Sequence, residues 1–284
     1  AWKNRIEKWS YTLSGKEKND WDAFLFFQTE LKQLPEIVKA NMINVEKTYF
    51  SASYQNFGCL FTGSVQPLGD EAFDLLYRFT KVFDQTFTRF LDLEKAEAQA
   101  KEAIKQASLD RVRGEISSMR STEDLQRITP LVFNELTTLG VPFIRCGVFI
   151  IQEAKENVEV YLSAPDGHSL GVLNLAFDSN ELTTNSVDYW RKGKVYHQHW
   201  NQADFIAWTK SMMKTGQVQN QKTYQGAEVA PESLDLHFIP FTQGMLYVGN
   251  VNALTEEKID LVKSLAKAFA MAYARYEDFV RLEH

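Results

Sequence analysis

The sequence lacks a long apolar segment, a basic excess and a set of cysteines. No apolar run approaches the roughly 18 residues of a membrane helix. A net charge of -6 is unlike the concentrated basic surface of proteins that bind nucleic acid. Two cysteines, Cys59 and Cys146, are too few for a disulfide framework and fit a reducing compartment. We therefore expect a cytoplasmic protein that contacts neither membranes nor nucleic acid.

What the sequence does contain is enough apolar material for a sizeable core. Of its 284 residues, 44% are hydrophobic and 13% are aromatic. That length allows about two domains.

The sequence repeats part of itself at an offset of 186 residues. Matching pairs begin with Gly58 and Gly244 and continue into the segments that follow. The pairs are Gly58/Gly244, Leu60/Leu246, Gly63/Gly249, Val65/Val251, Leu68/Leu254, Glu71/Glu257, Asp74/Asp260, Leu75/Leu261, Lys81/Lys267, Phe83/Phe269, Arg89/Arg275 and Asp92/Asp278. Trp2-Lys3 and Trp21 resemble Trp190-Arg191 and Trp208 more loosely.

We interpret residues 1–93 as the truncated C-terminal half of a first module whose complete second copy covers 119–281. Residues upstream of Ala1, or a dimer partner, are then expected to cover the apolar side chains of this half. A chain that begins at Ser121 is expected to fold alone, and residues 1–93 are not. The last residues, 282–284, resemble the remnant of a tag.

A long helix is predicted after the first copy, because neither proline nor glycine interrupts the chain between Asp70 and Gly114. Residues 94–118 would be the connector helix between the modules. An apolar stripe repeats along the helix at spacings of 3, 4 and 7 residues: Phe79, Phe83, Phe90, Leu93, Ala100, Ile104 and Ala107. Such a stripe predicts a parallel homodimer through this helix. The alternative is a solvated helix that packs on its own domain.

The complete copy predicts an α/β domain. A helix is expected over 121–140 with Ser121 as its N-cap, followed by strands over 143–151, 157–165 and 169–177. Asp166-Gly167 is a hairpin turn signal. The expected elements after it are a helical crossover around 203–214, a hairpin of 234–241 and 245–251, and a terminal helix that begins near Thr255. This order indicates an antiparallel sheet with its terminal helices on one face.

Three features together resemble the GAF-domain family. They are Leu139-Gly140 after the first helix, the G-x-L-x-V-G-N motif at 244–250, and Thr255-Glu256-Glu257 at the start of the last helix. The resemblance implies a sensory module like the tandem modules of bacterial sensor histidine kinases and related two-component signalling proteins. Such modules bind a small molecule or a partner and signal through dimer helices. They are not enzymes themselves, and any output domain would lie outside these residues.

Two other functions stay open. The first is a ligand-free module for dimerisation and spacing. The second is a small-molecule enzyme that uses His197, His199 or His237.

The sequence departs from the ligand signatures of the GAF family. The Asn-Lys-Phe-Asp-Glu set of the cyclic-nucleotide-binding members is absent. Residues 178–233 contain no cysteine, so no covalent bilin chromophore is expected. The cofactor is therefore unknown.

Ligand-binding candidates come from the crossover and the strands. The aromatic candidates are Trp190, Tyr196, Trp200 and Trp208, and the polar candidates are Arg145, Tyr161, Asn174 and His237. Aromatic walls with a few polar groups suit a small-molecule pocket. The alternative is that the aromatic side chains only fill the core.

His197-Gln198-His199 could chelate a transition metal on an extended segment, with His237 or Asp204 as third ligand. The first copy has Trp9-Ser10-Tyr11 near this place, so we predict no bound metal. Cys146 and Cys59 are both expected to be small core residues.

Overall fold

The structure is a computed structural model of the chain that describes residues 6–120, 124, 127–163, 167, 169–218 and 230–283. The chain divides into two compact units, Ala1–Gln99 and Ala100–His284. We call them the first and the second unit and describe each by itself. The expected boundary at residue 119 lies too late, because the second unit already begins at Ala100. Trp2-Lys3 and His284 lie outside the described residues.

The first unit contains an antiparallel sheet in the order β1-β2-β3. Its elements are β1 (Trp9–Ser14), α1 (Gly15–Gln28), the 3-10 helix η2 (Glu30–Gln33), α2 (Glu36–Ile43), β2 (Lys47–Gln55), β3 (Gly58–Ser64) and the beginning of α3 (Asp70–Ser118). Of these, β1, α1, η2, α2 and β2 were not predicted.

The core of the first unit is small. Its buried hydrophobic residues among those described are Leu13, Phe26, Phe50 and Ala52. Several large aromatic side chains stay exposed, among them Phe27 at 81% and Phe61 at 51%. Cys59 on β3 is also exposed, so its prediction as a core residue is wrong. Its counterpart Met245 is fully buried on a strand that has neighbours on both sides.

The repeat in the sequence reappears in the structure as matching strands. β8 (Ser233–Phe241) and β9 (Gly244–Asn250) have the bounds of β2 and β3 shifted by 186 residues. Gln55 pairs with Gly58 as Phe241 pairs with Gly244, and the rest of the two ladders keeps the same register. The two hairpins are therefore built alike.

The second unit contains a six-stranded antiparallel sheet in the order β6-β5-β4-β9-β8-β7 among its described residues. Before the hairpin its elements are α4 (Ile128–Thr138), β4 (Arg145–Gln152), the 3-10 helix η4 (Glu153–Lys155), β5 (Asn157–Ser163), β6 (Ser169–Ala176), α5 (Glu181–Arg191), β7 (Tyr196–Asn201) and α6 (Gln202–Lys214). After β8 and β9 comes α8 (Glu256–Glu283). The three early strands, the hairpin and the terminal helix confirm the predicted order, whereas α5 and β7 are additions.

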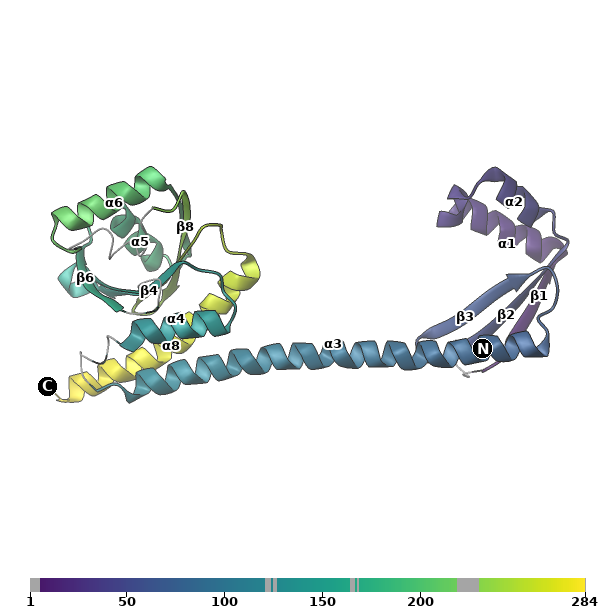
Figure 1. The fold of residues 1–284 in the computed structure, drawn as a ribbon, viewed down its shortest axis with the longest axis horizontal. Coiled ribbons are helices and arrows are strands. Elements are labelled where there is room, and N and C mark those ends of the chain that lie inside the picture. The colour runs from purple at the N-terminus through teal and green to yellow at the C-terminus, as the bar shows by residue number, and fades with distance from the viewer. Residues whose placement is uncertain are drawn as a thin grey trace. The chain divides into compact units, whose positions relative to one another are not determined.

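The sheet of the second unit has two buried faces. Because side chains alternate along a strand, Cys146, Val148 and Ile150 face a core formed with α4, α8 and the end of α3. Phe149 and Ile151 face the opposite core under α5 and α6. Figure 1 shows α4 and α8 on one side of the sheet, and α5 and α6 on the other. The predicted placement of the terminal helices on one face is confirmed.

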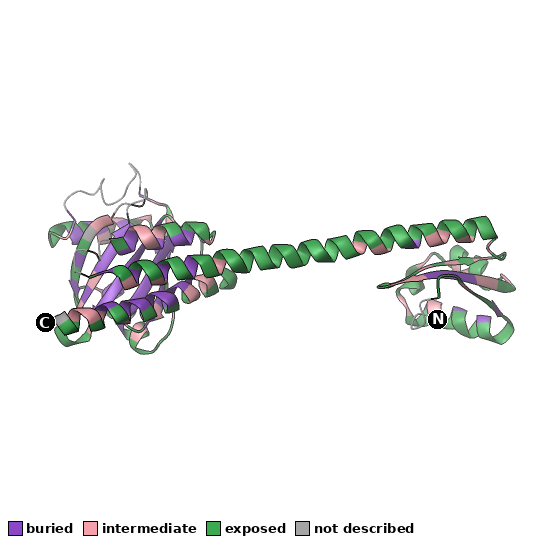
Figure 2. Cartoon of the chain, turned by 90° about the horizontal axis from the view of Figure 1, so that it is seen from below, coloured by how far each residue is buried: buried purple, intermediate pink, exposed green. Residues whose placement is uncertain are grey.

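The C-terminal end of α3 belongs to the core of the second unit. Leu109, Val112, Ile116 and Met119 are buried there, and the burial colours of Figure 2 show this end of α3 beside α8. Glu135 of α4 accepts two hydrogen bonds of 2.7 Å from Arg111. Residues 94–118 are therefore not merely a connector. No described helix, α3 included, has a stretch apolar enough to span a membrane.

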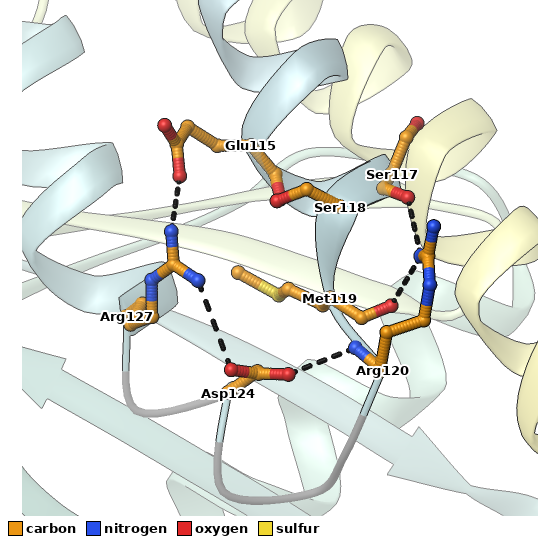
Figure 3. A network of polar contacts seen from close by, with 7 residues as sticks. All are labelled: Glu115, Ser117, Ser118, Met119, Arg120, Asp124 and Arg127. Carbon is orange, nitrogen blue, oxygen red and sulfur yellow. Dashed lines mark hydrogen bonds and ion pairs between the residues drawn. The ribbon is translucent and has the colours of Figure 1, made fainter.

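Polar contacts tie α3 to the beginning of α4 (Figure 3). Arg127 donates to Glu115 at 2.6 Å and lies 3.7 Å from Asp124. The Asp124 carboxylate accepts from the backbone N–H of Arg120 at 2.8 Å. The helix expected over 121–140 begins only at Ile128. Its expected N-cap, Ser121, lies outside the described residues, as does Asp166 of the expected turn.

Candidate functional site

A cavity of about 750 Å³ lies against the sheet face that α5 and α6 cover. This volume falls within the range of small-molecule pockets, which is roughly 300–1,000 Å³. The sheet contributes Arg145, Phe149, Val160, Leu162, Trp200, Leu234, Leu236, Phe238 and Tyr247. The rest of the described lining is Phe133, Thr137, Gly140, Val141, Pro142, Phe143, Ile144, Leu182, Phe205, Trp208 and Pro231.

Three aromatic rings from three strands form the floor of the cavity. Phe149 meets Phe238 edge to face, with ring centroids 5.1 Å apart. Tyr247 lies 5.1 Å from Phe238 and 5.9 Å from Phe149. Neighbouring strands pair in register and side chains alternate along each strand, so these three rings fall on the same face. The floor is therefore apolar and built on inner strands of the sheet.

Two tryptophans, one on the edge strand β7 of the sheet and one on α6, form another side of the cavity. Trp200 near the end of β7 and Trp208 on α6 lie with ring centroids 5.6 Å apart. Asn201 and Asp204 form a capping box: the Asn201 side chain accepts from the Asp204 N–H at 3.1 Å, and the Asp204 carboxylate accepts from the Asn201 N–H at 3.0 Å. This cap fixes where α6 begins and so positions Trp208 and Phe205 against the sheet.

Arg145 supplies the charge at one end of the cavity. It is the first residue of β4 and alternates onto the cavity face with Phe149. Its side chain is almost completely buried. It is the one charged side chain among the described lining residues. A buried guanidinium among aromatic rings favours ligands that carry negative charge or acceptor oxygens.

The structure brings together three of the eight predicted ligand-binding residues, namely Arg145, Trp200 and Trp208. Tyr161 faces the other core, and His237 contacts Leu254 through a 3.2 Å hydrogen bond that its Nε2 accepts. These two residues therefore do not line the cavity.

The other three predicted residues also lie outside the cavity lining. Asn174 is exposed on β6. Trp190 donates from its indole N–H to the carbonyl of Phe241 at 2.8 Å and borders a separate pocket. Tyr196 stacks on Phe238 beside the cavity at 5.6 Å.

The aromatic floor and Phe205 complete the cavity but were not among the predicted site residues. Phe205 was visible as part of the aromatic crossover. The alternation of Leu234, Leu236 and Phe238 along one strand was a second usable signal, because it assigns all three to one face.

His197 and His199 lie on the extended strand β7 and both contact Asp235. The distances are 2.7 Å from His197 Nε2 and 3.3 Å from His199 Nδ1. The rings of His197 and His237 stack with centroids 4.5 Å apart. Asp204, the other proposed third ligand, is used in the cap of α6. In the described part of the chain no three His, Cys, Asp or Glu side chains are arranged to hold a metal.

His237 is expected to make stability depend on pH. Burial lowers its pKa below 6.5, and nearby His197 lowers it further, whereas Asp235 opposes both effects. The folded state therefore keeps the ring neutral, while the unfolded chain takes up a proton near pH 6.5. The free energy of unfolding should fall as pH drops below about 6.5. Urea unfolding of the wild type and of His237→Gln between pH 7.5 and 5.5 measures this. If the free energy of unfolding fell with pH equally in both proteins, this prediction would be contradicted.

Cys146 gives the site no nucleophile. Burial raises the pKa of its thiol to about 12, so the reactive thiolate is not formed near neutral pH. The Ser163 hydroxyl beside it donates to the backbone carbonyl of Cys146 at 3.0 Å. Cys146 is confirmed as a core residue.

No protein-family model matches the sequence, and no curated protein does either. Two solved structures are similar in fold. One is the GAF domain of an Acinetobacter phosphoenolpyruvate-protein phosphotransferase, at 14% identity and a TM-score of 0.37 over 61% of this chain and 94% of that one. The other is the GAF domain of such a phosphotransferase from Coxiella burnetii, at 15% identity and a TM-score of 0.38 over 61% of this chain and 95% of that one.

Both matched chains are GAF domains.

Proposed function

We propose that the second unit is a sensory or regulatory GAF-like module that binds a small molecule, within a bacterial signal-transduction protein. The observation that carries the proposal is the cavity of about 750 Å³ with its aromatic floor and its single buried cation. The module would act as an input and not as an enzyme. Ligand binding would favour one arrangement of α3 and α8, which pack on the far face of the same sheet.

The neutral fluorescent probe N-phenyl-1-naphthylamine tests whether the cavity takes a ligand. Its fluorescence should rise to saturation at about one equivalent, and the melting temperature should rise because the probe binds only the folded state. Val160→Phe, which adds a ring to the lining, should weaken binding. Val172→Phe is the matched control, since Val172 lies on β6 outside the lining. Absence of saturable binding by the wild type would contradict the proposal.

A second candidate function, a ligand-free module for dimerisation and spacing, is favoured by the surface of α3. Apolar side chains of this helix are exposed over more than seven turns: Leu75, Phe79, Val82, Phe83, Phe90, Leu91, Leu93 and Ile104. A helix with an uncovered apolar stripe is typical of a partner-binding surface. The probe experiment separates the two functions, because a pure spacer gives no saturable binding.

We also propose that the first unit is the C-terminal half of a second GAF-like module. The shared register of β2-β3 and β8-β9 supports this. β1 pairs with β2 as β7 pairs with β8, with the repeat shifted by one further residue on β1: Trp9 pairs with Ala52, and Tyr196 with Phe238. In the second unit β9 also pairs with β4, whereas β3 has β2 as its one neighbour among the described residues. The proposal accounts for the exposed aromatic side chains of the first unit.

A further inference from the structure

The polar groups of the cavity gather at the end where β4 begins. Arg145 pairs with Gly249 of β9. A side chain at Gly249 would collide with the hydroxyl oxygen of Tyr247, which lies 2.3 Å from the place of such a Cβ atom. The Tyr247 hydroxyl therefore extends over Gly249 toward the strand position opposite Arg145. One guanidinium and one phenol hydroxyl share this end of the cavity.

The remainder of the described lining is overwhelmingly apolar. Beyond the polar end the ligand would meet the rings of Phe149, Phe238 and Trp200 on the sheet and that of Trp208 on α6. Such rings bind flat, apolar bodies through their faces and edges. The two ends of the cavity thus differ in chemistry and would orient a ligand that differs in the same way.

We propose that the ligand of this cavity is an organic monoanion: a flat, apolar body that carries one carboxylate or sulfonate group. The anionic group would lie at Arg145 and Tyr247, and the body between the aromatic face of the sheet and Trp208 of α6. The inference rests on the proposed small-molecule function of the second unit and adds the chemical class.

The charge count favours a monoanion. The planar guanidinium has five N–H donors, so it can bind two oxygens of an anion alongside other partners. A di- or triphosphate would bring several negative charges to a lining with one described cation. Because uncompensated charges are costly to bury, such ligands fit poorly.

Two fluorescent probes with the same body test the inference. 8-Anilinonaphthalene-1-sulfonate has one sulfonate, and N-phenyl-1-naphthylamine has the same rings without it. The wild-type chain should bind the sulfonate about tenfold more tightly, which is the size expected for charged hydrogen bonds. Arg145→Gln should remove this preference and leave the affinity for the neutral probe unchanged. Tyr247→Phe should reduce the preference by a smaller factor. Arg191→Gln, an exposed cation paired with Glu153 outside this cavity, should change neither affinity.

The outcomes separate this inference from the proposed function. Equal affinity of the wild type for both probes overturns the monoanion class but leaves a small-molecule site. Failure of both probes to bind contradicts the site itself. If Arg145→Gln loses both probes equally, Arg145 shapes the cavity rather than binding the anion, and the inference falls. Near-ultraviolet circular dichroism shows whether each variant keeps its packed core, since the sulfonate also binds loosely packed states. If Arg145→Gln does not fold, the inference is tested by the wild type's preference for the sulfonate probe and by the loss of preference in Tyr247→Phe.

Discussion

A fragment of residues 121–283 is expected not to fold, whereas residues 100–283 should fold as an independent domain. The shorter fragment lacks Leu109, Val112, Ile116 and Met119, all of which are buried in the core of the second unit. Each fully buried apolar side chain of this kind stabilises a fold by about 1.5–3 kcal/mol. Four of them together approach the whole free energy of unfolding of a typical domain, about 5–15 kcal/mol.

The shorter fragment also leaves a carboxylate without its partners. The Glu135 side chain is 5% exposed and accepts from Arg111 at 2.7 Å and from Ser108 at 2.6 Å. Burial tends to raise the pKa of Glu135, but these hydrogen bonds and the Arg111 charge outweigh burial and lower it. Without α3 the same carboxylate would be unpaired, which is strongly destabilising if it stays buried.

Amide dispersion in two-dimensional NMR spectra of the fragments is the measurement. We expect well-dispersed spectra from residues 100–283 and poorly dispersed spectra from 121–283. The spectrum of 1–93 should also be poorly dispersed, because its aromatic side chains are exposed. A cooperative melt of 121–283 would show that α3 is dispensable. A dispersed, monomeric spectrum of 1–93 would show that this segment is a complete domain. The sequence predicted that a chain from Ser121 folds alone. The structure replaces this prediction with one for the longer fragment, residues 100–283.

The full chain is expected to form a homodimer through α3 that Phe83→Glu together with Phe90→Glu dissociates. These side chains are 46% and 53% exposed, and two buried carboxylates in a seam would cost more than a thin coiled-coil interface contributes. The predicted stripe ends at Ala107, and Val112 beyond it belongs to the core of the second unit. Phe83 and Phe90 both contact Phe87, which in turn contacts Phe57 at 4.8 Å.

Light scattering at tens of micromolar measures the mass of the wild type and of both variants. The matched control is Gln85→Glu with Gln99→Glu. It adds the same charge at exposed positions on the opposite side of α3. The wild type and the control should have the mass of a dimer, and the Phe83/Phe90 variant that of a monomer. A monomeric wild type would rule out the dimer, and a dimeric double variant would move the interface elsewhere.

The sequence by itself determined the elements whose signal is local. The repeat located β3 and β9, and the apolar pattern of 234–241 located β8. The period of apolar residues located β4, β5, β6 and α8, and the alternation around Cys146 placed it in the core. The absence of glycine and proline after Asp70 predicted α3, which runs to Ser118.

Where the sequence pattern was weak or fitted two structures, only the tertiary structure decided which one forms. β7 reads YHQHWN, which has too few apolar residues to predict a strand, yet its pairing with β8 makes it one. Leu109, Val112 and Ile116 are spaced as a dimer seam or as a core face. Helical spacing alone fits both, and only the packing of α3 on the second unit decided between them.

The composition of the cavity was likewise decided by register between strands. Tyr161 pairs opposite Val148, so its side chain falls on the face that α4 and α8 cover. Arg145 and Phe149 lie on the other face, because they are one residue out of step with Val148. A shift of one residue in the pairing of Tyr161 would have moved it into the cavity. The sequence could supply the aromatic side chains and the arginine. Which of them face one another depends on contacts between residues far apart in the chain, and those exist only after the sheet has formed.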